Sequence, residues 1–65
     1  MLRKLAGSCS DGVTCPAAWL DDEDGTVIVQ GYETGSVEPL PPTPDGEARV
    51  RLPQAILREA ARALR

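Results

Sequence analysis

The stretch Thr26-Val-Ile-Val-Gln30 carries the strongest strand signal of the sequence, because four of its five residues are β-branched. It follows the loop Asp21-Asp-Glu-Asp-Gly25, which ends in an Asp-Gly pair that favours a left-handed turn. The segment before the loop, residues 13–20, alternates with period two and places its odd-numbered positions on one side. Pro16 cannot donate to a ladder, so it favours an edge strand or a later start. We therefore predict a β-hairpin over residues 13–30.

A proline-rich connector, residues 36–46, follows the hairpin. It holds Pro39, Pro41, Pro42 and Pro44. Proline at this density excludes helix and ladder pairing and favours extended, semi-rigid backbone. Its PxxP spacings are of the kind that dock on aromatic-lined grooves. We interpret the connector as a structural loop, because short proline-rich crossings are common.

The remainder of the chain predicts a third strand and one helix. Glu47 to Leu52 alternates apolar and charged side chains, which is typical of a strand with one wet face. Pro53 ends this strand and is preorganised to open a helix. Residues 54–64 are amphipathic. The apolar stripe comprises Ile56, Leu57, Ala60, Ala63 and Leu64, and a second face carries Arg58, Arg62 and Arg65.

The predicted fold class is α+β, a small three-stranded antiparallel sheet with one C-terminal amphipathic helix. We expect residues 1–12 to be a loose N-terminal segment with at most one short strand near Leu2 to Leu5, and residues 13–65 to be a single domain. A folded chain of 65 residues exposes about 4,000 Å². Trp19 and Tyr32 are the only aromatic residues. We expect Trp19 to fill the core between sheet and helix, since so few large side chains are available.

The composition argues against an enzyme. Histidine is absent, which removes Cys-His and Ser-His-Asp nucleophile arrangements and imidazole zinc ligands. The sequence has no glycine-rich phosphate loop and no nucleophile elbow. The acidic run Asp21 to Asp24 lacks the spaced ligands of a calcium loop and is interpreted as a solvated turn. We therefore predict no catalytic residue and no cofactor.

The two cysteines, Cys9 and Cys15, form a candidate thiol pair. The sequence shows neither a secretory signal nor an apolar stretch long enough to span a membrane, so we expect a cytoplasmic protein. In that compartment free thiols are favoured. Two alternatives remain open, a disulfide between the two residues and a zinc site that either pools thiolates from two chains or recruits Asp11.

Charge is strongly segregated along the chain. Nine of the ten acidic residues lie between Asp11 and Glu47, where no Lys or Arg occurs, and five arginines follow from Arg49 onward, for a net charge of −3. Divided charge suits a protein partner with complementary patches and argues against nucleic acid. The candidate partner-binding residues are Tyr32, Arg49, Arg51, Arg58 and Arg62.

The segment Ala48-Arg-Val-Arg-Leu-Pro-Gln-Ala-Ile-Leu-Arg-Glu-Ala resembles the opening of ribbon-helix-helix and AbrB-type DNA-binding antitoxins. In the first family, alternate polar residues of the ribbon read bases. The resemblance implies that role for Arg49 and Arg51. This gives an alternative function, a DNA-binding antitoxin-like dimer.

A broader likeness spans more of the chain. The elements Ser8-Cys-Ser-Asp-Gly12, Cys15, Thr26 to Gln30, Asp45-Gly46 and Arg49 to Leu64 occur in an order that is similar to small BldB-like actinobacterial proteins, which are encoded beside helix-turn-helix regulators. The resemblance implies an accessory protein that contacts a transcriptional regulator. From it and from the charge pattern we predict a protein-interaction module, whose partner is a helix-turn-helix regulator or a second copy of the chain.

Overall fold

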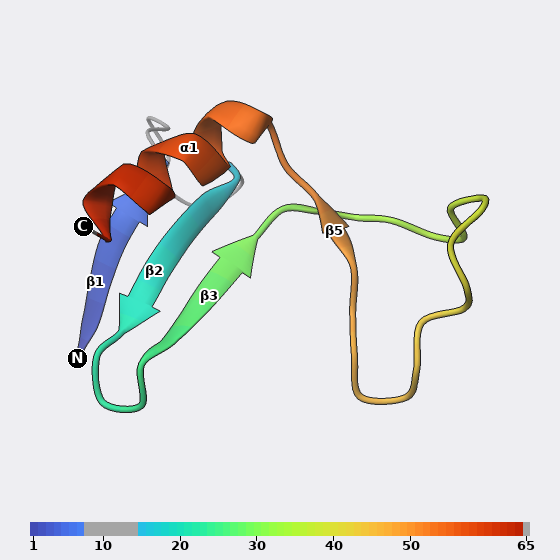
Figure 1. Cartoon of the computed structure of the whole chain (residues 1–65), viewed down its shortest axis with the longest axis horizontal. Coiled ribbons are helices and arrows are strands. Elements are labelled where there is room, and N and C mark those ends of the chain that lie inside the picture. Colours follow the sequence, from blue (N-terminus) through green and yellow to red (C-terminus); the bar gives the residue numbers. More distant parts are fainter. Residues whose placement is uncertain (8–14, 65) are drawn as a thin grey trace.

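The computed structural model describes residues 1–7 and 15–64 and shows a small α+β fold (Figure 1). A three-stranded antiparallel sheet has the order β1-β2-β3, and α1 lies across β1 and β2. The elements are β1 (Leu2–Ala6), β2 (Ala17–Asp21), β3 (Thr26–Gln30), β4 (Tyr32–Glu33), β5 (Val50–Arg51) and α1 (Gln54–Ala63). The predicted fold class is confirmed.

The central hairpin forms where the sequence predicts it. β2 and β3 pair from Ala17 opposite Gln30 to Asp21 opposite Thr26. The turn closes with a bond from the Gly25 amide to the Asp21 carbonyl at 3.0 Å. Gly25 has φ 75°, a left-handed conformation that costs glycine little. β2 begins directly after Pro16, because proline cannot donate to the ladder.

The third strand of the main sheet is β1, in the region that was expected to be loose. It pairs with β2 from Leu2 opposite Asp21 to Ala6 opposite Ala18, with a register shift between Lys4 and Ala6. The shift lets the neighbours Leu5 and Ala6 both be buried, at 5% and 2% exposure. The short strand expected near Leu2 to Leu5 is thus present and belongs to the main sheet, so the expectation of a loose segment is wrong for Leu2–Ala6. Residues 8–12 lie outside the described residues.

The strand expected over residues 47–52 is much shorter than predicted and lies outside the main sheet. Only Val50–Arg51 is extended as β5, and it pairs with β4 in a separate two-stranded ladder. Its alternating pattern has no buried partner surface, because both Val50 and Leu52 remain partly exposed. Because the apolar side chains of this segment have no buried surface to pack against, the alternating pattern forms only a two-residue strand.

The core between sheet and helix consists mostly of alanines. Its buried members are Leu5, Ala6, Ala18 and Ala60, and Ala17 is buried outside this cluster. Leu20, Ile56 and Ala63 pack against this cluster from β2 and α1. α1 starts after Pro53, as predicted, and buries only Ala60. Leu57 and Leu64 of its predicted apolar stripe are exposed, and α1 packs mainly on β1 and β2.

Trp19 does not fill this core. Ala18 and Leu20 belong to the cluster under the helix, and side chains alternate along a strand, so Trp19 points to the other face of the sheet. It is half-buried there, between Lys4 of β1 and Ile28 of β3 in register. The expectation for Trp19 is wrong, because the close helix–sheet contact made by alanines leaves no space for an indole.

Residues 31–53 form an arm that extends to the side of the sheet (Figure 1). The arm leaves β3 at Gly31, turns back through the proline-rich segment and returns along β5 to the start of α1. A Cβ on Gly31 would overlap the carbonyl oxygen of Arg51, so the two backbones approach closely only because this residue is glycine. Gly31 thus fixes the base of the arm.

Candidate functional site

The arm is ordered by hydrogen bonds and proline. The Leu40 amide donates to the Val37 carbonyl at 2.7 Å, and the Glu47 amide donates to the Pro44 carbonyl at 3.1 Å. Arg49 holds the connector in place, since its Nη1 donates to the Pro41 carbonyl at 2.6 Å. A bond from the Thr34 amide to the Arg49 carbonyl at 3.4 Å continues the β4–β5 ladder. As predicted, the connector has neither helix nor strand.

Two adjoining hollows lie on the arm, beside Arg49. The first, about 330 Å³, is lined by Thr34, Val37, Leu40, Arg49, Val50 and Arg51. The second, about 320 Å³, lies between Thr34, Arg49 and the proline-rich segment. They have the size of small-ligand sites. The second hollow has a mixed lining that includes the polar side chains of Ser36, Glu38 and Thr43. The lining of the first is mostly apolar, so it fits an apolar side chain.

The structure brings together three of the five candidate partner-binding residues. Tyr32 and Arg51 lie directly opposite each other in the β4–β5 ladder. Tyr32 is 62% exposed, and Arg51 is also exposed. Arg49 is partly buried, and its guanidinium donates a hydrogen bond to the Pro41 carbonyl. We call Tyr32, Val37, Leu40, Arg49, Val50 and Arg51 the arm surface.

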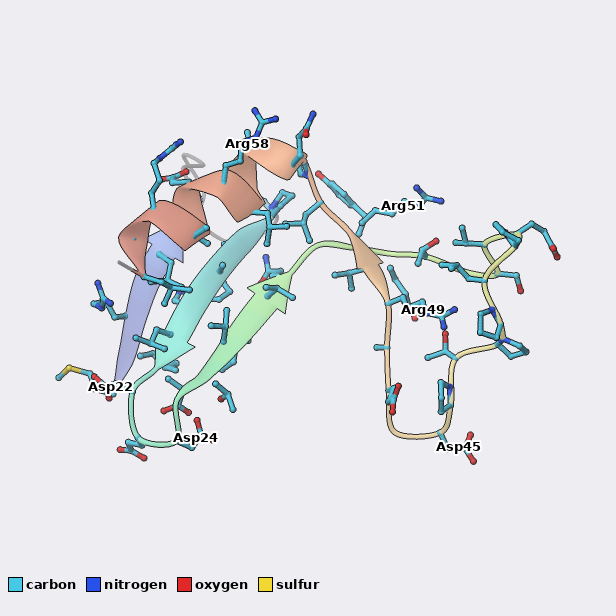
Figure 2. All side chains as sticks on the ribbon, in the orientation of Figure 1. Asp22, Asp24, Asp45, Arg49, Arg51 and Arg58 are labelled. Atoms are coloured by element: carbon cyan, nitrogen blue, oxygen red, sulfur yellow. The ribbon has the colours of Figure 1, made fainter. Side chains whose placement is uncertain are left out.

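Arg58 and Arg62 are elsewhere. Both are exposed on α1, and Arg58 donates to Gln54 Oε1 at 3.2 Å within the same helix. Figure 2 shows Arg58 on the outer side of α1, away from Arg49 and Arg51. The five candidate residues therefore do not form one surface.

Sequence reasoning missed the apolar part of the arm surface. Leu40 is 51% exposed and reaches both hollows from within the proline-rich connector. Its position between prolines was the available signal, because proline keeps the backbone extended and leaves an isolated leucine without a core to enter. Val37 and Val50 complete the apolar lining.

The cations of the arm have no acidic partner in the part of the chain that the structure describes. The ion pairs found there join the N-terminal amine of Met1 to Asp22 and Glu23, at 3.0 and 3.4 Å. They tie the start of β1 to the β2–β3 turn. The positive charge of Arg51 is thus available to a partner, although an exposed charge adds more to the rate and register of binding than to affinity.

The β2–β3 turn contains a carboxylate whose pKa is shifted. The Thr26 hydroxyl donates to Asp24 Oδ1 at 2.6 Å, and the Thr26 amide donates to the same oxygen at 3.0 Å. Both bonds favour the charged form and lower the pKa of Asp24 below its usual value of 3.8. Asp24 is exposed, and its role is to close the turn.

Cys15 is disulfide-bonded, so the expectation of free thiols is wrong at this residue. Cys9, the only other cysteine of the sequence, lies outside the described residues. The Cys15 carbonyl accepts a bond from Gln30 Nε2 at 2.9 Å, which attaches this position to the end of β3. A sulfur in a disulfide is not a thiolate zinc ligand.

Within residues 1–7 and 15–64, Cys, Asp and Glu side chains do not gather in groups of three that would hold a metal ion. Over the same residues no helix has the length and apolar character to cross a membrane. No protein-family model, curated protein or solved structure matches the chain. The arm surface is the candidate site.

Proposed function

We propose that this protein is a non-enzymatic protein-interaction module that binds a protein partner with its arm surface. The observation that carries the proposal is the exposure of Tyr32 and Leu40, at 62% and 51%, beside the unpaired charge of Arg51. An aromatic and an aliphatic anchor next to an arginine is the composition typical of the centre of protein interfaces. Isolated exposed leucines are ordinary, but Leu40 lines a hollow together with Arg51, the residue that lies opposite Tyr32.

The partner we propose is a transcriptional regulator of the helix-turn-helix class. This part of the proposal rests on the resemblance of the chain's layout to BldB-like proteins and on the segregated charge. A helix or loop of the regulator would insert an apolar side chain beside Leu40 and place an acidic side chain near Arg51.

Site-specific photocrosslinking in the source cells tests the surface. Tyr32→p-benzoylphenylalanine puts the reactive group on the arm, and Leu57→p-benzoylphenylalanine puts it on the exposed face of α1 as the matched control. We expect one discrete protein adduct from position 32 and none from position 57. Adducts from position 57 alone, or from neither position, would contradict the proposal.

The purified partner is then titrated with charge variants. Arg51→Glu should weaken binding about tenfold or more, because it replaces a favourable charge by an unfavourable one at the interface. Arg58→Glu makes the same change on α1 and should have little effect. A steeply salt-dependent affinity for duplex DNA, lost in Arg51→Glu, would favour the antitoxin-like alternative instead.

The compartment belongs to the proposal as well. A cytoplasmic protein has to keep its Cys15 disulfide against the glutathione pool, whereas an oxidising compartment preserves it. The disulfide therefore supports the alternative of a disulfide-stabilised module. Rapid alkylation of thiols in intact cells distinguishes a reducing from an oxidising compartment. A reduced chain gains mass from the reagent, and an oxidised chain does not.

A further inference from the structure

The two edges of the three-stranded sheet are built differently. β1 carries Arg3 and Lys4 and has an irregular register, two features that discourage a further strand from pairing with an edge. β3 carries no charge, no proline and no bulge, and its register with β2 is regular over all five residues. One edge of the sheet is thus protected and the other is open.

The open edge is also strongly apolar. Val27, Ile28 and Val29 are 42%, 45% and 43% exposed, although β-branched residues in a strand are usually covered. α1 stays on β1 and β2, and the sheet order places no described strand beyond β3. In Figure 1 this outer strand lies clear of the helix.

We propose that β3 pairs with β3 of a second copy of this chain, antiparallel and centred on Ile28. The strand reads Thr-Val-Ile-Val-Gln, so it is nearly the same in both directions. Centred pairing places Ile28 opposite Ile28 of the second copy and Val27 opposite its Val29. Polar Thr26 meets polar Gln30 at each end. A two-fold axis requires such a self-complementary patch, and no like charges face each other across it.

The resulting six-stranded sheet would join the apolar side chains of both copies. Lys4, Trp19 and Ile28 form one row across the face that α1 leaves open. Across the axis this row continues into Ile28 and Trp19 of the second copy. The two helices share the other face, because a two-fold axis perpendicular to the sheet keeps each helix on the same side.

The exposed area of the chain exceeds that of a compact domain. The structure exposes 5177 Å², against about 4,000 Å² for a compact monomer of 6.9 kDa from the scaling 6.3 M^0.73. The excess includes both the exposed arm and the uncovered apolar side chains of β3. The protected β1 edges stop the pairing at two copies, since neither end of the six-stranded sheet is open.

This dimer goes beyond the proposed function, because it uses β3 and leaves the arm surface of both copies to other partners. The test is the mass of the oxidised full chain in sedimentation equilibrium. We expect the wild type at twice 6.9 kDa. Ile28→Glu and Ile28→Lys each place like charges face to face across the axis and should halve the mass, while an equimolar mixture of the two variants should restore it.

Leu57→Glu is the matched control, because Leu57 is a similarly exposed aliphatic residue on α1 and its substitution should leave the dimer intact. Far-UV circular dichroism establishes that each variant is folded. A wild type that stays at 6.9 kDa, or forms open-ended aggregates, would overturn the proposal. So would an Ile28→Glu variant that remains dimeric.

A second measurement needs no variant. Hydrogen exchange of the β3 amides of the wild type should slow with rising protein concentration, while exchange in β1 should not change. Exchange in β3 that is independent of concentration would also overturn the dimer. Neither result affects binding of a partner to the arm surface. That binding is measured separately, by crosslinking from position 32 and by titration of Arg51→Glu.

Discussion

The sheet with its helix and the arm are held together by different forces. In the first region, small apolar side chains are buried between β1, β2 and α1. In the arm, every residue between Gly35 and Ala48 except Val37 is exposed, and order comes from backbone bonds, proline and the Arg49–Pro41 contact. Burial is cooperative across a domain, whereas local bonds at a surface act one by one. The two regions should therefore respond separately to mutation.

The largest effect is expected from Ala60→Asp. Ala60 is 4% exposed at the centre of the helix–sheet contact, so an unpaired carboxylate there should cost about 3 kcal/mol or more. A domain of this size has little more stability than that, so the packed region should unfold. Circular dichroism and urea denaturation measure the loss.

Ala61→Asp is the matched control for this substitution. Ala61 is exposed on the same helix, so the change should cost only its helix propensity, about 0.7 kcal/mol or less. Equal losses from the two variants would mean that the helix does not pack on the sheet as described.

The disulfide at Cys15 should contribute the next largest effect. Cys15→Ser removes the cross-link close to the start of β2 and should lower the free energy of unfolding by about 2 kcal/mol. Adding a reductant should shift the urea midpoint of the wild type but not that of Cys15→Ser. A wild-type midpoint that ignores the reductant would contradict this expectation.

Gly31→Ala should separate the two regions. The new Cβ overlaps the Arg51 carbonyl oxygen, and overlap of this kind costs about 1–3 kcal/mol. We expect the Thr34 amide, which bonds to Arg49 across the arm, to exchange about tenfold faster or more. The Gly25 amide in the β2–β3 turn should keep its protection.

Gly35→Ala is the control within the arm. A Cβ at Gly35 meets no atom within 4 Å, so exchange of the Thr34 amide should be nearly unchanged. Loss of protection at both Thr34 and Gly25 in Gly31→Ala would show that arm and sheet unfold as one unit.

The smallest effect concerns the pH dependence of the β2–β3 turn. The folded-state pKa of Asp24 is below its unfolded value, so its contribution to stability is present above that value and is lost as pH falls through the folded pKa. Thr26→Ala removes the hydroxyl bond and should raise the pKa of Asp24 back toward 3.8. An NMR titration of the Asp24 carboxyl carbon measures this, and Thr34→Ala in the arm should leave it unchanged.

The sequence predicted those parts of the fold whose signals are local. The β-branched run of β3, the Asp24-Gly25 turn and the Pro53 helix start all depend on neighbours in the chain. The sequence predicts at most a short strand at β1 and does not place it in the main sheet, because its partner β2 is about fifteen residues away and its exposed Arg3 and Lys4 weaken the strand signal. The length of β5 also depends on a distant partner. Its sequence alternates as a strand should, but only two residues of β4 pair with it.

The candidate site was predicted in part. Tyr32, Arg49 and Arg51 were identified from residue type, and the structure brings them together on the arm. Arg58 and Arg62 share only their charge with these residues. Both lie on α1, and Figure 2 shows Arg58 away from Arg49 and Arg51. The contribution of Leu40 depends on how the proline-rich connector folds back beside β5, which no local pattern encodes.

In the part of the chain that the structure describes, three of the four buried residues between sheet and helix are alanines, which has a consequence for mutational mapping. An alanine scan would leave these three positions untested, because they are alanines already. A methyl group also has no rotamers to freeze, so the helix docks without side-chain entropy loss. The informative scan runs in the opposite direction: enlarging Ala18 or Ala60 to valine or leucine should map the contact by steric excess.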